Sequence, residues 1–160
     1  MSPSEKDQIL KRIEEGSARL AEYAGLAPET LSKPYAPGKW TGVQVLFHLA
    51  QTDTVLLYRF FKTVAEPGSP IVPFDQDRWV AEPDAASRPV RLSVELSLGA
   101  RQVLAHCLRS LSDEVLARSG RHPERGELSA LGIAKIAADH TLHHLEQLEA
   151  IRAGQPWKPK

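Results

Sequence analysis

The chain has almost no cysteine, no net charge and no long uninterrupted hydrophobic run. Its 160 residues include one cysteine, Cys107, which excludes an internal disulfide and favours a reducing, cytoplasmic compartment. Lysine and arginine number 20, as do aspartate and glutamate, so bulk charge recruits no nucleic acid. No apolar run approaches the length of a membrane span, and the N-terminus lacks the apolar core of a signal peptide. We therefore expect a cytoplasmic protein that binds neither nucleic acid nor membrane.

A clear strand-like alternation is also missing, and apolar residues recur with helical spacing along most of the chain. Turn and cap signals predict four helices, at about residues 2–25, 41–65, 89–116 and 129–154. Ser2 and Ser87 are the expected caps of the first and third helices. Four helices around one core predict an all-α four-helix bundle, formed as a single domain by residues 1–160.

Prolines are concentrated between the second and third expected helices. Residues 66–88 contain four of them: Pro67, Pro70, Pro73 and Pro83. This connection is too long for a tight antiparallel turn. We expect a Pro-rich crossover that leaves the two helices parallel, with a lid over a site as the alternative. Phe74 and Trp79 within it favour a segment that packs against the bundle.

Three of the six histidines fall within five positions, in the run D-H-T-L-H-H-L-E-Q-L. His140 and His144 are one helical turn apart, about 40° apart around the axis, so they share one face. That face is otherwise apolar, and it carries Ile133, Ala137, Leu148 and Ile151. Buried imidazoles need hydrogen-bond partners or a metal ion. His143 lies about 100° from His144 and is less suited to face the same point.

A catalytic metal site usually has three protein ligands and an open position, so a third ligand is needed. His48, in the second expected helix, lies on a side with polar residues such as Thr52. Helix bundles commonly build metal sites between facing helices, which makes His48 the candidate. The alternative is a histidine that is hydrogen-bonded to a carbonyl group or water. Asp53 lies about 140° from His48 and is not assigned as a ligand.

Other polar residues are less favoured as metal ligands or substrate contacts. His106 falls near the expected inner face of the third helix, with Leu92, Leu96 and Val103, and is a less favoured fourth ligand. His122, in a Gly/Pro-flanked turn, is expected to be solvated, and Cys107 to be a small core residue. Arg59 lies on the His48 side, about 16 Å along the helix axis. It could hold the carboxylate of an acidic substrate, with an ordinary surface arginine as the alternative.

Two stretches resemble the DinB-like superfamily of metal-binding four-helix bundles. They are P-G-K-W-T-G-V-Q-V-L-F-H-L-A-Q-T-D at residues 37–53 and A-D-H-T-L-H-H-L-E-Q-L-E-A-I-R at residues 138–152. The resemblance implies that His48, His140 and His144 bind one divalent ion, with His143 as a neighbour and not a ligand. It also implies an up-down-down-up bundle and often a homodimer. Such relatives include thiol-dependent S-transferases and a maleylpyruvate isomerase.

The type of reaction follows less directly from the residues. Three neutral imidazoles suit zinc, nickel, iron or copper. A zincin carries a glutamate directly after the first histidine of its motif, whereas this chain has Thr141. A thiol activated by the metal needs no such base, so we expect transfer of a low-molecular-weight thiol involving a small-molecule substrate. A metal-dependent hydrolase, a non-catalytic metal-binding stress-response protein and an interaction protein with hydrogen-bonded histidines are the alternatives. No catalytic residue is assigned.

Overall fold

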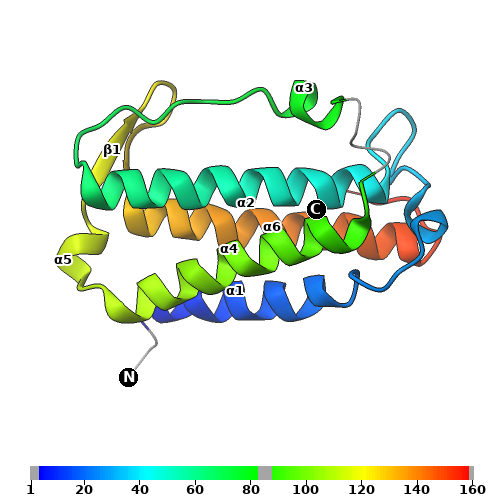
Figure 1. Cartoon of the computed structure of the whole chain (residues 1–160), viewed down its shortest axis with the longest axis horizontal. Helices are drawn as coiled ribbons and strands as arrows, with labels where there is room; N and C mark the ends of the chain where they lie inside the picture. The colour runs from blue at the N-terminus through cyan, green and yellow to red at the C-terminus, as the bar shows by residue number, and fades with distance from the viewer. Residues whose placement is uncertain (1–3, 83–87, 159–160) are drawn as a thin grey trace.

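Four long helices pack side by side in the computed structural model, which describes residues 4–82 and 88–158 (Figure 1). They are α1 (Glu5–Ala21), α2 (Gly42–Ala65), α4 (Val90–Ser110) and α6 (Ala130–Arg152). α2 packs against α4 and α6, and α1 packs against the same two helices. α1 and α6 run in one direction and α2 and α4 in the other (Figure 1). The predicted four-helix bundle and its up-down-down-up order are confirmed.

Side-chain caps fix where these helices begin. The Ser4 hydroxyl accepts a hydrogen bond from the Asp7 backbone N–H, and the Asp7 side chain accepts one from the Ser4 N–H. This reciprocal capping box starts α1, whereas the predicted cap Ser2 lies outside the described residues. Thr41 and Gln44 form the same arrangement at the start of α2. The Ser129 hydroxyl caps α6 by accepting a bond from Gly132.

The chain after α4 differs from the prediction. α4 ends at Ser110 and not near Leu116, because Ser112 caps a separate short helix, α5 (Asp113–Leu116). The predicted cap of α4, Ser87, lies outside the described residues. An unpredicted antiparallel hairpin follows, formed by β1 (Ser119–His122) and β2 (Gly126–Ser129). Strands of four residues are too short to give a clear alternating signal.

The segment after α2 lies along α2 and is held there from two sides (Figure 1). The backbone of Ile71 donates to the Arg121 carbonyl of the hairpin at 2.8 Å. The Gln51 side chain donates to the Trp79 carbonyl at 3.0 Å, where α3 (Gln76–Val80) contacts α2. A 3-10 helix, η1 (Pro28–Leu31), precedes α2. Because the connection to α4 includes residues 83–87, its complete crossing of the bundle stays a prediction.

The inward face of α4 differs from the predicted one. Leu92, Leu96 and Val103 are 49%, 53% and 42% exposed, and His106 is exposed as well. The buried face instead includes the polar side chain of Arg101. The prediction from apolar spacing was therefore wrong for this helix. His106 cannot act as a fourth ligand inside the bundle.

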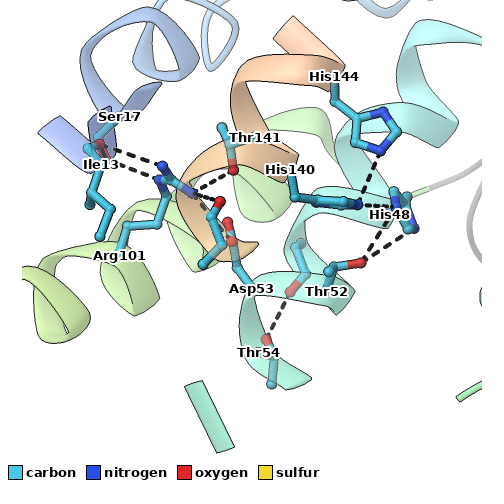
Figure 2. A network of polar contacts seen from close by, with 12 residues as sticks. Ile13, Ser17, His48, Thr52, Asp53, Thr54, Arg101, His140, Thr141 and His144 are labelled. Carbon is cyan, nitrogen blue, oxygen red and sulfur yellow. Dashed lines mark hydrogen bonds and ion pairs between the residues drawn. The ribbon is translucent and has the colours of Figure 1, made fainter. Parts of the chain in front are cut away.

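A buried polar network joins all four long helices at the middle of the bundle (Figure 2). The Arg101 guanidinium of α4 donates to the Ser17 hydroxyl of α1 at 3.1 Å and to the Ala137 carbonyl of α6 at 3.3 Å. It also donates to the Thr141 hydroxyl and forms an ion pair with Asp53 of α2 at 3.4 Å. Burial raises the pKa of the Asp53 carboxyl to about 6, although Arg101 acts in the opposite direction. The carboxylate of Asp53 is thus committed to Arg101.

None of the helices in the described part of the chain is both long and apolar enough to span a bilayer.

Candidate metal centre

Three histidines from two helices meet inside the bundle (Figure 2). His48 comes from α2, and His140 and His144 come from successive turns of α6. The Nε2 atoms of His48 and His140 are 3.0 Å apart, and those of His140 and His144 are 3.2 Å apart. One nitrogen from each ring lies within 4.8 Å of the other two. The structure thus brings together the three residues that the sequence singles out.

The spacing of these nitrogens fits a single metal ion. Zinc–nitrogen bonds of about 2.0–2.1 Å in a tetrahedral site place the ligand nitrogens about 3.3 Å apart. Hydrogen bonding alone satisfies the group less well, because a neutral imidazole carries only one N–H. Nε2 of His140 faces two other Nε2 atoms at once and can donate to only one of them. A cation between the three rings would engage all three lone pairs.

Burial keeps the three imidazoles in the neutral form that binds metals. Desolvation, followed by the charge of His144, lowers the pKa of His48 from its ordinary value of 6.5 to about 3. Desolvation also lowers the pKa of His144 to about 4, opposed by its hydrogen bond to Gln147. The pKa of His140 is lowered well below 6.5, first by desolvation and then by the charge of His144. At neutral pH, no proton has to leave before a metal binds.

A side chain that the sequence analysis missed, Gln147, orients one of these rings. Nδ1 of His144 donates to Oε1 of Gln147 at 2.7 Å, which leaves Nε2 of His144 as the bare nitrogen that faces the cluster. The amide of Gln147 in turn donates to Nε2 of His143 at 3.3 Å. His143 is exposed and lies outside the three-histidine group. Its spacing of three residues from His144 places both side chains on one face of α6, and this spacing could have indicated the contact.

Trp40 and Thr52 enclose His48. The Trp40 ring packs against the His48 ring, with 4.7 Å between their centroids. The Thr52 hydroxyl lies 3.4 Å from Nδ1 of His48, one helical turn along α2. These contacts fix the ring that α2 contributes, as Gln147 does for α6.

A pocket of about 250 Å³ reaches the histidine cluster from one side. Thr52 and His140 line it, so a small molecule in the pocket approaches the cluster through His140. Its walls come from α2, α6, the segment after α2 and the hairpin, including Leu56, Arg59, Phe74, His122 and Ile136. Arg59, which the sequence places on the His48 side of its helix, does line this space. His122, which was expected to be solvated, is half-buried and lines this pocket.

The lowered histidine pKa values make the metal-free protein sensitive to acid. Below about pH 6.5 the unfolded chain takes up protons on these three residues, and the folded chain does not. The free energy of unfolding should therefore be highest above that pH and fall as the pH drops toward 4, by up to about 1.4 kcal/mol per pH unit for each histidine. Urea denaturation followed by circular dichroism measures this slope. His144→Leu should reduce the slope and His106→Gln, at an exposed position, should not; equal slopes for wild type and His144→Leu would contradict the assignment.

Gln147 provides a second test, on metal affinity. We expect Gln147→Leu to weaken zinc binding about 10- to 100-fold, because the His144 ring loses the acceptor that fixes its tautomer and orientation. Gln147→Glu keeps an acceptor oxygen and should retain most of the affinity. Gln102→Leu, at an exposed position on α4, is the matched control. Competition with a chelator of known affinity measures the change. Unaltered zinc binding by Gln147→Leu would contradict a role of Gln147 in orienting His144.

Known proteins share this sequence pattern. Residues 12–148 match the family model of the DinB superfamily. A protein of Oceanobacillus iheyensis named "putative metal-dependent hydrolase" is 35% identical over 143 residues, which cover 88% of this chain and 81% of that protein. A protein of Geobacillus kaustophilus with the same description is 32% identical over 136 residues, which cover 84% of this chain and 76% of that protein.

Solved structures share the fold. YfiT from Bacillus subtilis, described as a "probable metal-dependent hydrolase with an unusual four-helix bundle topology", superposes with a TM-score of 0.86 at 26% identity, covering 97% of this chain and 91% of YfiT. A mycothiol-dependent maleylpyruvate isomerase superposes with a TM-score of 0.71 over 89% of this chain and 60% of its own, but at 12% identity the likeness concerns the fold alone. The family match spans all three clustered histidines, and the chain belongs to the DinB superfamily.

Proposed function

We propose that this protein is a metal-dependent enzyme whose divalent ion is bound by His48, His140 and His144. One observation carries the proposal: the Nε2 atoms of His48 and His144 converge on that of His140, and His140 lines a pocket of about 250 Å³. Catalytic zinc sites combine three protein ligands with a position left for water or substrate. The two relatives described above, which are 35% and 32% identical, are named as metal-dependent, which supports the same requirement here.

The proposal also includes the identity of the metal, the domain organisation and the cellular compartment. Imidazole nitrogens suit zinc, nickel and iron, so elemental analysis has to identify the metal. Residues 1–160 are taken as one domain, since the family match covers most of that length. A cytoplasmic location is consistent with Cys107, a free thiol, because free thiols persist in a reducing compartment.

Transfer of a low-molecular-weight thiol is the first candidate reaction. A bound divalent ion would lower the pKa of a thiol or water molecule that reaches it. Within the described ranges, no carboxylate joins the three histidines in the cluster. The hydroxyl of Thr141, at the position of the zincin glutamate, accepts a hydrogen bond from Arg101. A thiol that is deprotonated on the ion needs no general base, so these surroundings favour thiol chemistry.

Hydrolysis is the second candidate, and the names of the relatives favour it. Both curated relatives and YfiT are described as metal-dependent hydrolases. In this reaction, water would take the place of the thiol. The one carboxylate in the pocket lining is that of Glu124, an exposed residue at the hairpin tip beside Arg125. A non-catalytic metal-binding protein is the remaining alternative.

Metal content and turnover test these alternatives in order. Protein purified without a histidine tag should carry about one divalent ion per chain, and His144→Ala should lose it whereas His106→Ala should not. The loaded protein should then join cysteine, glutathione or coenzyme A to an electrophile such as 1-chloro-2,4-dinitrobenzene, detected by absorbance. Cleavage of ester or amide substrates without thiol transfer would favour hydrolysis. A metal-loaded protein that does neither would support the non-catalytic alternative, and a metal-free protein would contradict the whole proposal.

We further propose that the protein forms a homodimer through an outer apolar patch on α2 and α4. The surface proposed for the contact carries the exposed apolar side chains of these helices, Tyr58, Phe61, Leu92, Leu96 and Val103, which are between 42% and 60% exposed. The two helices that carry it pack against each other. Large exposed apolar patches mark interaction sites, and a two-fold dimer buries the same patch on both copies.

Oligomeric state tests the patch directly. The wild-type protein should sediment as a dimer at micromolar concentration, and Leu96→Glu should sediment as a monomer because a carboxylate would be buried in the interface. Val72→Glu is the control, since Val72 is 66% exposed but lies outside the patch. A monomeric wild-type protein, or a dimer that Leu96→Glu leaves intact, would contradict the proposal.

A further inference from the structure

Two arginines line the pocket, away from the end at which it meets the histidine cluster. Arg59 comes from α2 and Arg125 from the tip of the hairpin. Arg59 is seven residues beyond Thr52, which places it about 10 Å further along the helix axis. The pocket thus runs from a candidate metal centre toward a pair of positive charges.

Only part of the hydrogen-bonding capacity of the Arg59 guanidinium is satisfied within the protein. Its Nη2 donates to the Val72 carbonyl at 2.6 Å, and its guanidinium lies 5.7 Å from the centre of the Phe74 ring. Its Nε is buried and has no hydrogen-bond partner among the described residues. Burial, and then the charge of Arg125, lower the pKa of Arg59. Neither guanidinium forms an ion pair with a carboxylate of the described residues, so the two positive charges repel each other.

The hairpin tip adds another donor. Nδ1 of His122 accepts hydrogen bonds from the backbone N–H groups of Glu124 and Arg125, at 3.2 and 3.3 Å. The ring proton of the neutral histidine must therefore be on Nε2, where it can donate. Glu124 is the one acidic residue in the lining, so two arginines against one glutamate leave the lining with a net positive charge.

We propose that the substrate of this pocket carries a carboxylate that binds between Arg59 and Arg125, while its reacting group lies at the His140 end. This inference rests on the proposed function for the identity of the reacting end. Arginine presents its N–H groups as a planar fork that matches a carboxylate, and such charge-assisted bonds are strong. A single carboxylate also balances the excess positive charge of the lining.

The residues that line the pocket between its two ends indicate the chemistry of the middle part of the substrate. Leu56, Leu128 and Ile136 line the pocket there, together with the Phe74 ring. These side chains offer no hydrogen bonds, so the part of the substrate that they contact is apolar. The preferred ligand is thus a small acid with an apolar middle and a reactive group opposite its carboxylate.

Binding to metal-free protein tests this inference separately from metal chemistry. Hexanoate and 1-hexanol share the alkyl chain and differ in the charged group, and NMR titration of ¹⁵N-labelled, EDTA-stripped protein measures the affinity for each. Hexanoate should bind about tenfold more tightly, as expected for a charge-assisted contact. Its advantage should shrink at high salt.

Three variants locate the contact. Arg59→Gln and Arg125→Gln should each remove most of the preference for hexanoate and leave the affinity for 1-hexanol unchanged. Arg121→Gln is the matched control: Arg121 belongs to the same hairpin and also donates to a backbone carbonyl, that of Gly68, but it does not line the pocket. Arg125→Gln keeps the test valid if Arg59→Gln fails to fold, since the Arg125 side chain makes no hydrogen bond or ion pair with the described residues.

Equal affinities of the wild-type protein for the two probes, or a preference that both variants retain, would overturn the inference. Failure of the proposed function gives a different result. If the protein binds no metal but still prefers hexanoate, in a manner that depends on Arg59 and Arg125, the carboxylate subsite is supported and the proposed enzymatic function is contradicted.

Discussion

The buried guanidinium of Arg101 is the interaction on which the rest of the structure depends. It bonds with groups from all three other long helices, and its side chain is 1% exposed. Its partner Asp53 is equally enclosed, and removing one member of such a pair would leave an uncompensated charge inside the bundle. Its contacts with Ala137 and Thr141 lie three residues before and one residue after His140, so the same side chain helps to fix the rotation of α6 that directs His140 inward.

The metal centre and the pocket depend on different parts of the molecule. The bundle supplies the three imidazoles, their burial and the orienting contacts of Gln147 and Trp40. The pocket walls also need the segment after α2 and the hairpin, which hold each other through backbone bonds between Ile71, Ser69 and Arg121. Changes in these connecting segments would alter what binds near the ion without moving the ligands, a division common in rigid scaffolds with variable loops.

The parts of this site that were predictable are those with a strong periodic signal. His140 and His144 share the most apolar face of a long helix, and their convergence follows from 3.6 residues per turn. His48 was a weak candidate from its own helix, and the family resemblance singled it out. The inward face of α4 was predicted wrongly because Ser97 and Arg101 are buried polar residues, and only their partners on other helices make that burial favourable. The hairpin, and with it the role of His122, depends on contacts with residues about fifty positions earlier in the chain.

The two ends of the pocket differ in charge. The histidines at one end are neutral, whereas Arg59 and Arg125 at the other end are positively charged. The histidines are kept uncharged by burial, so a divalent ion would bring its whole charge into the bundle. That charge would repel Arg59 and Arg125 across the pocket, and Glu124 is the one acidic residue among the described residues that line it. An anionic reactant that touches both ends offsets this repulsion twice, once at each end, whereas a neutral one leaves it in place. Charges interact more strongly beside apolar walls such as Leu56 and Ile136 than in open water, so the proposed pocket would favour an anionic over a neutral reactant.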